Sequence, residues 1–337
     1  MLKIYRNLFF LGLLNFSVFL QAQVVRSVEG VSITVSNLKS AIAFYTKVLP
    51  FELDTVYITN DSFLQSLYNL QDSSLCTETA QLRLGDEKIE LVEFHSASYR
   101  GRPIPSASKS NDLWFQHIAI VVNDMEKAYK ILEQNNVTHV STMPQTLPVY
   151  IPAAAGIKAF YFRDTDGHNL ELIQFPKGKG NPKWEKYTDI TFLGIDHTAI
   201  GVEATNTSLD FFTHFLHLEV AGESINYGVE QEHLNQVFGA HLRITGLKAT
   251  QGMGIELLDY IAPPGGMPYM ADTNPTDVWY WLTKLKVDNV DAYYNLAKNK
   301  GLSLKSLKLT TLNKALNGIS KAFIVSDTDG HAYLIYE

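Results

Sequence analysis

The chain has 337 residues, of which 46% are apolar and 19% are charged, and its 28 basic and 35 acidic residues give a net charge of −7. This length is enough for two domains of ordinary size, each with its own core. The acidic balance and the absence of a basic run give nucleic-acid binding little electrostatic support. The single cysteine, Cys76, excludes an intramolecular disulfide.

Residues 1–22 have the organisation of a signal peptide. Lys3 and Arg6 form a positive segment, an apolar run follows at 8–20, and Ala22 is a small residue before a plausible cleavage site. The apolar run of about thirteen residues is short for a bilayer span. We therefore expect an exported protein, periplasmic or secreted, with no membrane attachment after cleavage. The alternative is a buried N-terminal helix.

From residue 28 onward the hydrophobic period alternates regularly between that of a strand and that of a helix, and it predicts a β-α-β-β-β unit that occurs four times. The units are 28–95, 113–176, 193–261 and 278–337. Their predicted elements are strands 28–35, 51–57, 79–84 and 88–94 with a helix capped by Asn37; strands 115–122, 137–142, 158–162 and 169–175 with helix 125–134; then helices 207–216 and 290–300 in the third and fourth units. The Pro- and Gly-rich segment 177–192 reads as a linker between domains 28–176 and 193–337.

Recurring motifs show that the two halves are homologous. Asp112-Leu113-Trp114 recurs as Asp277-Val278-Trp279, an offset of 277 − 112 = 165. The turn 164–168, Asp-Thr-Asp-Gly-His, recurs at 327–331, an offset of 163. Two offsets this similar indicate a duplicated pair of units. We expect the aspartates to form turns, and His168 and His331 to be turn or strand-start residues.

The motifs 116–124, Gln-His-Ile-Ala-Ile-Val-Val-Asn-Asp, and 162–172, Phe-Arg-Asp-Thr-Asp-Gly-His-Asn-Leu-Glu-Leu, carry a resemblance to a known group. The chain after residue 27 resembles the vicinal oxygen chelate superfamily, which includes glyoxalase I, bleomycin-resistance proteins and extradiol dioxygenases. The resemblance implies an α+β fold in which paired units form cupped mixed sheets with helices outside. It also implies a divalent metal held by the first and last strands of each unit.

Transferred unit by unit, these ligand positions are unevenly filled. The second unit has His117 and Glu171, and the third has His197 and Glu256. The first unit has Gly30 and Glu90, and the fourth has Leu282 and Leu334. A metal is therefore expected only where the second and third units contribute.

The strand patterns support the same residues. Glu171 and Glu256 each lie between aliphatic residues, so alternation turns the glutamate away from the helix layer. A carboxylate on the concave side of a sheet is costly unless it is paired or binds a metal. Two imidazoles and two carboxylates suit one divalent ion, and they do not choose among Zn, Ni, Co, Fe and Mn.

Two arrangements of the units are open. If the first pairs with the second and the third with the fourth, the donors divide into Glu90, His117 and Glu171 in one cleft and His197 and Glu256 in another. If the second pairs with the third and the first with the fourth, one cleft holds all four of His117, Glu171, His197 and Glu256, and the other is blank. We prefer the second arrangement because it yields one complete site.

The hypothesis from the resemblance is an exported glyoxalase-like metalloenzyme of lyase or isomerase type that chelates vicinal oxygens of a small substrate. Glu171 or Glu256 would move a proton between carbons. A metal-free binding protein resembling bleomycin-resistance proteins is one alternative. An extradiol ring-cleavage dioxygenase is another, although that resemblance needs a fourth-unit histidine. Trp114, Tyr150 and Glu90 are candidates for the substrate cleft, and a monomer is plausible.

Overall fold

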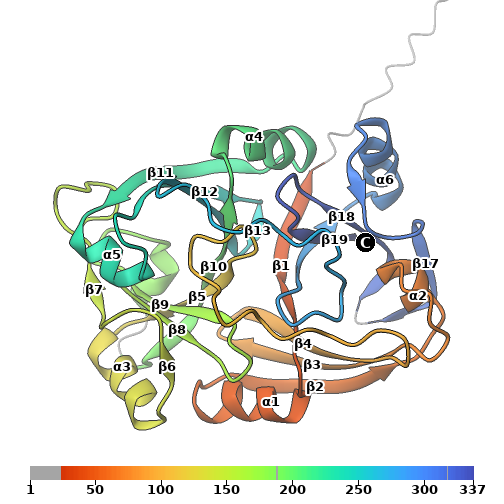
Figure 1. Ribbon diagram of the computed structural model, residues 1–337, viewed down its shortest axis with the longest axis horizontal. Helices are drawn as coiled ribbons and strands as arrows, with labels where there is room; N and C mark the ends of the chain where they lie inside the picture. Colours follow the sequence, from red (N-terminus) through yellow and green to blue (C-terminus); the bar gives the residue numbers. More distant parts are fainter. Residues whose placement is uncertain (1–23, 187–188, 317) are drawn as a thin grey trace, which may run out of the picture.

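The computed structural model describes residues 24–186, 189–316 and 318–337 (Figure 1). The expected signal peptide, 1–22, lies outside these residues. No helix in the described ranges is both long and apolar enough to cross a bilayer.

Each predicted unit is present as a strand, a helix and further strands. The first two units contain β1 (Val25–Thr34), α1 (Leu38–Lys47), β2 (Glu52–Thr59), α2 (Phe63–Tyr68), β3 (Cys76–Leu84) and β4 (Glu87–His95), then β5 (Gln116–Val122), α3 (Met125–Gln134), β6 (Thr138–His139), β7 (Gln145–Thr146), β8 (Lys158–Arg163) and β9 (Asn169–Gln174).

The second half begins after a short 3-10 helix, η1 (Pro182–Lys186). It contains β10 (Phe192–Val202), α4 (Thr205–Leu209), the π-helical η2 (Asp210–Phe215), β11 (Glu219–Tyr227), α5 (Val229–Asn235), β12 (His241–Lys248), β13 (Gln251–Gly252) and β14 (Gly254–Ala262), then β15 (Trp281–Val287), α6 (Val290–Asn299), β16 (Ser303–Leu304), β17 (Thr310–Leu316), β18 (Ile319–Ser326) and β19 (Ala332–Tyr336). The single helix expected over 207–216 is thus an α-helical turn continued by a π-helical one.

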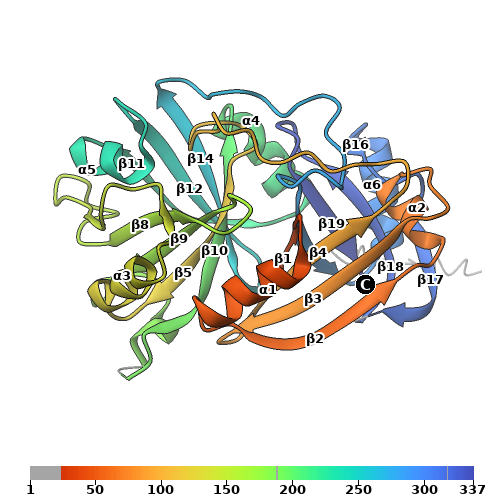
Figure 2. The same ribbon diagram turned by 60° about the horizontal axis from the view of Figure 1, so that its bottom comes forward.

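The strands form two curled sheets, and neither is confined to one half of the chain. Sheet A has the order β16-β18-β19-β15-β1-β4-β3-β2, and sheet B has the order β11-β12-β14-β10-β5-β9-β8-β6. The first unit therefore pairs with the fourth and the second with the third, as the preferred arrangement predicted. In each sheet the two first strands, β1 with β15 and β5 with β10, meet antiparallel at the centre. The α+β fold with cupped sheets is confirmed, and the longer helices lie outside (Figures 1 and 2).

The helices start where the sequence supplies a capping side chain. Asn37, Asp124 and Asn289 each accept a hydrogen bond from the backbone N–H three residues later, at the starts of α1, α3 and α6. Such a cap satisfies one of the free N–H groups of the first turn. The same capping hydrogen bond in three of the units fixes the residue at which the first helix begins after the first strand.

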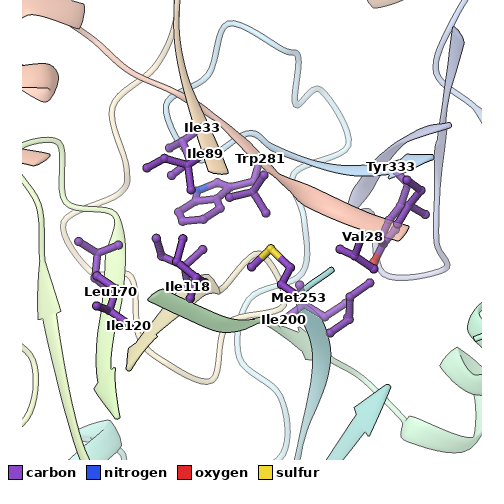
Figure 3. Close-up of a cluster of buried hydrophobic side chains, with 14 of the residues drawn as sticks. Val28, Ile33, Ile89, Ile118, Ile120, Leu170, Ile200, Met253, Trp281 and Tyr333 are labelled. Atoms are coloured by element: carbon purple, nitrogen blue, oxygen red, sulfur yellow. The ribbon is translucent and has the colours of Figure 1, made fainter. Parts of the chain in front are cut away.

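The convex faces of the two sheets pack against each other through apolar side chains. Figure 3 shows Ile118 and Ile200 of sheet B facing Ile33 and Trp281 of sheet A, with Met253 between the sheets. Each of these side chains is at most 3% exposed. Burying a side chain of this size stabilises the fold by about 1.5–3 kcal/mol. The apolar contact leaves the concave faces directed away from each other.

Two buried histidines connect the sheets at their ends. His168 Nε2 lies 2.8 Å from the carbonyl oxygen of Val278, just before β15, and its Nδ1 lies 2.8 Å from Asp164 Oδ2. His331 Nε2 lies 2.8 Å from the carbonyl oxygen of Gly201 on β10. These residues start strands, as expected, and they also join one sheet to the other.

Candidate metal centre

The concave face of sheet B brings together the histidines and glutamates of the second and third units. His117 lies on β5, Glu171 on β9, His197 on β10 and Glu256 on β14. The register pairs His117 with Ala199 and His197 with Ala119, so an alanine lies opposite each imidazole. Side chains this small leave space between the two rings, whose centroids are 6.0 Å apart.

Three of the four side chains form a tight group. Glu171 Oε2 lies 3.1 Å from His117 Nε2 and 3.8 Å from His197 Nε2. One donor atom from each of His117, Glu171 and His197 lies within 4.8 Å of the others, and all three residues are buried. Glu256 adjoins the group through its Oε2, 3.2 Å from His197 Nε2, and its side chain is 30% exposed. The structure thus brings all four predicted donors together on one face of sheet B.

The surroundings shift the pKa values of His117 and His197 in opposite directions. Burial lowers the pKa of His117, so its ring is neutral at pH 7. Burial also acts to lower the pKa of His197, but the carboxylates of Glu256, Asp196 and Glu171 outweigh it and raise this pKa to about 9. Burial, with Glu171 and Asp196 nearby, raises the pKa of Glu256. The His197 proton is therefore held among the carboxylates of Glu256, Asp196 and Glu171.

A divalent cation fits these residues. His197 Nε2 and His117 Nδ1 are buried and make no hydrogen bond among the described residues, although Glu256 Oε2 lies 3.2 Å from His197 Nε2 in an orientation unsuited to one. A buried polar nitrogen without a partner is costly, and a metal bond at Nε2 of His197 removes that cost. The donor chemistry, imidazole nitrogen with carboxylate oxygen, is that of Zn and of the first-row divalent metals. His117, Glu171 and His197 would hold the ion, with Glu256 beside it.

Asp196 is a supporting residue that the sequence pattern did not reveal. Its Oδ2 lies 3.1 Å from His197 Nδ1, and Trp184 Nε1 donates a 2.7 Å hydrogen bond to its Oδ1. Neighbouring side chains on a regular strand point to opposite faces, but the β5–β10 register shifts between Ile195 and His197. A carboxylate on the far nitrogen of a metal-binding histidine fixes its tautomer and orientation.

Tyr161 is a second residue missed from the sequence. It lies opposite Glu171 in the β8–β9 pair, and its ring centroid is 4.9 Å from that of His117. Burial and the charges of Glu171 and Glu256 raise its pKa well above 10, so the phenol keeps its proton. The only sequence signal was its position across the turn from Glu171. The apolar wall beyond it comprises Phe115, Leu234, Leu242, Leu258 and Tyr260.

The three predicted cleft residues lie in different places. Trp114 is buried and its Nε1 donates a 2.9 Å hydrogen bond to Ser108 Oγ. Tyr150 is 49% exposed, and its hydroxyl lies 3.1 Å from Glu230 Oε2 at the start of α5. Glu90 lies in sheet A, apart from the four donors.

At the equivalent place in sheet A, the ammonium group of Lys284 lies where sheet B has the candidate metal-binding residues. Gly30, at the position of His117, has φ +143, and a Cβ there would lie 2.1 Å from the carbonyl oxygen of Lys88, so no histidine fits. Lys284 reaches Glu90 with a 2.5 Å contact, and Ser32 Oγ donates to the same carboxylate at 2.6 Å. Burial opposes ionisation of Glu90, but Lys284 outweighs it and the pKa is lowered.

Comparisons with known proteins agree with this architecture. Residues 27–172 match the family model described as the Glyoxalase/Bleomycin resistance protein/Dioxygenase superfamily. No curated protein matches the chain in sequence.

Solved structures share the fold over nearly the whole chain. Glyoxalase I from Zea mays is similar with a TM-score of 0.57 at 15% identity, covering 94% of this chain and 93% of that one. A putative dioxygenase from Bacillus subtilis is similar with a TM-score of 0.56 at 14% identity, covering 94% and 86%. At such identities the likeness concerns the fold alone. The family match covers residues 27–172, and the shared fold extends over the rest of the chain, as expected from the resemblance to the vicinal oxygen chelate superfamily.

Proposed function

We propose that this protein is a metal-dependent enzyme that chelates adjacent oxygens of a small substrate and catalyses a lyase or isomerase reaction. The observation that carries the proposal is the convergence of His117, Glu171, His197 and Glu256 from four strands onto one concave face. His197 Nε2 makes no hydrogen bond although it is buried beside the carboxylates of Glu171 and Glu256, and a bound cation would stabilise this arrangement.

The protein residues divide into holding, orienting and proton-moving roles. A bound divalent ion would act as a Lewis acid toward the substrate oxygens. Asp196 holds the His197 ring in place, and the apolar wall around Tyr260 excludes water. Glu256 is the candidate base, since it is partly exposed, lies outside the tight group, and has a pKa that burial and the neighbouring carboxylates raise above its usual value.

The first test is the metal content of the purified protein after supplementation with each divalent ion. Wild type should bind one equivalent, and His117→Ala and His197→Ala should both lose it because they remove donors of the same site. His214→Ala is the matched control, since that histidine lies on η2, outside the strands that carry the donors, and its side chain is 71% exposed. A wild-type protein that takes up no metal would favour a metal-free binding protein.

A ring-cleaving oxygenase is a second candidate, favoured by the tight group itself. Two histidines and one carboxylate with open positions are the ligand set of non-haem Fe(II) oxygenases. Here that set would be His117, His197 and Glu171, with Glu256 as a neighbour. Oxygen uptake by Fe(II)-loaded protein with catechol distinguishes the two. Uptake would identify the oxygenase, whereas proton exchange on a hydroxyketone without oxygen uptake, lost in Glu256→Gln, would identify the isomerase.

Export is a further part of the proposal, based on residues 1–22. N-terminal sequencing of the protein recovered outside the cytoplasm should begin shortly after Ala22. Recovery of the uncleaved chain in the cytoplasm would contradict export.

A further inference from the structure

Arg163 and Asn169 are polar residues next to the metal donors, and neither has a role in holding the metal. Arg163 ends β8 and Asn169 begins β9, and the register pairs them directly. Asn169 is also paired with His117 on its other side. Strand alternation places Arg163 on the same face as Tyr161, and Asn169 on the same face as Glu171. Arg163, Asn169 and His117 therefore form a row across the concave face.

Both side chains are incompletely hydrogen-bonded. Arg163 donates one hydrogen bond, from Nη2 to the carbonyl oxygen of Ser108 at 3.1 Å, and its Nε is buried without an acceptor. Asn169 Oδ1 is likewise buried and unpartnered. No carboxylate in the described part of the chain forms an ion pair with Arg163. A guanidinium N–H withdrawn from water without an acceptor is unfavourable, so this arrangement suits an external anion.

Several of the unsatisfied buried atoms lie together on this face of sheet B. Of the ten buried side-chain atoms without a partner among the described residues, four belong to His117, His197, Arg163 and Asn169. The homologous positions in the other half, at the offset of 163, are Ser326 and Ala332, which pair in the same register beside Leu282. The Arg–Asn pair thus occurs where the donor set is complete and is missing from the equivalent pair of strands in sheet A.

We propose that Arg163 and Asn169 form an anion-binding subsite, so that the substrate carries a carboxylate beside its chelating oxygens. This inference rests on the proposed function and narrows its substrate class. The guanidinium presents a planar pair of donors that matches a carboxylate. Rotating the Asn169 amide by half a turn puts its NH₂ group at the place of the unpartnered Oδ1, where it can donate to the same anion. Arg163 selects the substrate by its charge, while the histidines and glutamates hold the metal.

The test compares chelating probes that differ in one carboxylate. Catechol, 2,3-dihydroxybenzoate and 3,4-dihydroxybenzoate are titrated calorimetrically into Co(II)-loaded wild type and into Arg163→Gln, Arg163→Lys and Arg100→Gln. Wild type should bind at least one dihydroxybenzoate about tenfold or more tightly than catechol, because a charge-assisted hydrogen bond is worth that factor. Arg163→Gln should lose this preference while keeping its Co(II) content, and Arg163→Lys should keep part of it. Arg100, which is exposed, provides the charge-matched control.

The outcomes distinguish a failure of the anion subsite from a failure of the proposed metalloenzyme function. Equal preference in wild type and Arg163→Gln, with catechol bound by both, would overturn the anion subsite and leave the metalloenzyme intact. Failure to bind Co(II) or catechol would contradict the proposed function. A metal-free arm then still tests Arg163: benzoate should raise the melting temperature of wild type and Arg100→Gln but not of Arg163→Gln, and an equal effect on all three would overturn the subsite.

Discussion

At the scale of single residues, the contact between Asp196 and His197 makes a specific prediction about metal affinity. Asp196→Asn keeps the size of the side chain but removes the charge that holds His197 Nδ1. Losing such an orienting carboxylate typically weakens metal binding about 10–100-fold. Competition with a chromophoric chelator should show this loss. An unchanged affinity would mean that Asp196 has no role in orienting the ligand.

For Lys284 we predict an effect on the stability of the fold and none on metal affinity. The Lys284 and Glu90 side chains are only 10% and 11% exposed, so Lys284→Met leaves a buried carboxylate without its partner. Breaking such a pair costs about 3–5 kcal/mol of unfolding free energy, measured by urea denaturation at pH 7.

Two controls identify the cause of that loss. The double variant Lys284→Met with Glu90→Gln should be more stable than Lys284→Met alone, because no buried charge remains. The pKa of Glu90 is lowered in wild type, so the stabilisation is present above its unfolded value and disappears as pH falls. The difference between wild type and Lys284→Met should therefore shrink in acid. A difference that is constant with pH would point to lost packing.

At the scale of elements, we expect the contact between the turn before β9 and the residues before β15 to contribute a pH-dependent stability. Both nitrogens of His168 face acceptors, Asp164 and the carbonyl oxygen of Val278, and this arrangement favours the protonated imidazole. Burial opposes this charge, but Asp164 outweighs it and raises the pKa of His168. Its stabilising contribution is therefore complete below the unfolded pKa near 6.5 and is lost as pH rises through the folded value.

The matching experiment follows the unfolding free energy of wild type and His168→Gln between pH 6 and pH 9. Wild type should lose stability relative to the variant as pH rises. His331 serves as the comparison, because among the described residues its Nε2 has an acceptor and its Nδ1 has no hydrogen-bond partner. If the unfolding free energies of wild type and His168→Gln change equally with pH, the protonated His168 does not stabilise this contact.

The elements also show what a sequence of this kind reveals and what it hides. The duplicated turn at 164–168 and 327–331 and the strand histidines at 117 and 197 were visible as local patterns, so the repeated units could be predicted. The same motifs carried the family resemblance, which implied the fold and the donor residues. Asp196 was hidden because its side chain reaches His197 through a register shift, which no local period encodes. Lys284 and Arg163 were hidden because their significance depends on partners in other strands, Glu90 for the first and Asn169 for the second.

At the scale of the whole molecule, the exchange of units between the sheets predicts that neither half folds alone. Residues 24–176 would supply β1 and β5 without their central partners β15 and β10, and would expose two long strand edges. Exposed edges of this kind associate with other chains. Gel filtration of the separately expressed halves should show aggregates or dimers, and coexpression should restore a one-to-one complex. A folded monomeric half would contradict this.

The lysine in the cleft of sheet A has a consequence for how the protein responds to its surroundings. One sheet carries its positive charge on a covalently attached ammonium group, and the other would receive it from solution. A chelator can remove only the second. Hydrogen exchange with and without chelator should therefore change along β5, β9, β10 and β14 and stay constant along β1, β4, β15 and β19. Scarcity of metal would loosen half of the molecule, while the lysine-bearing half stays assembled as its scaffold.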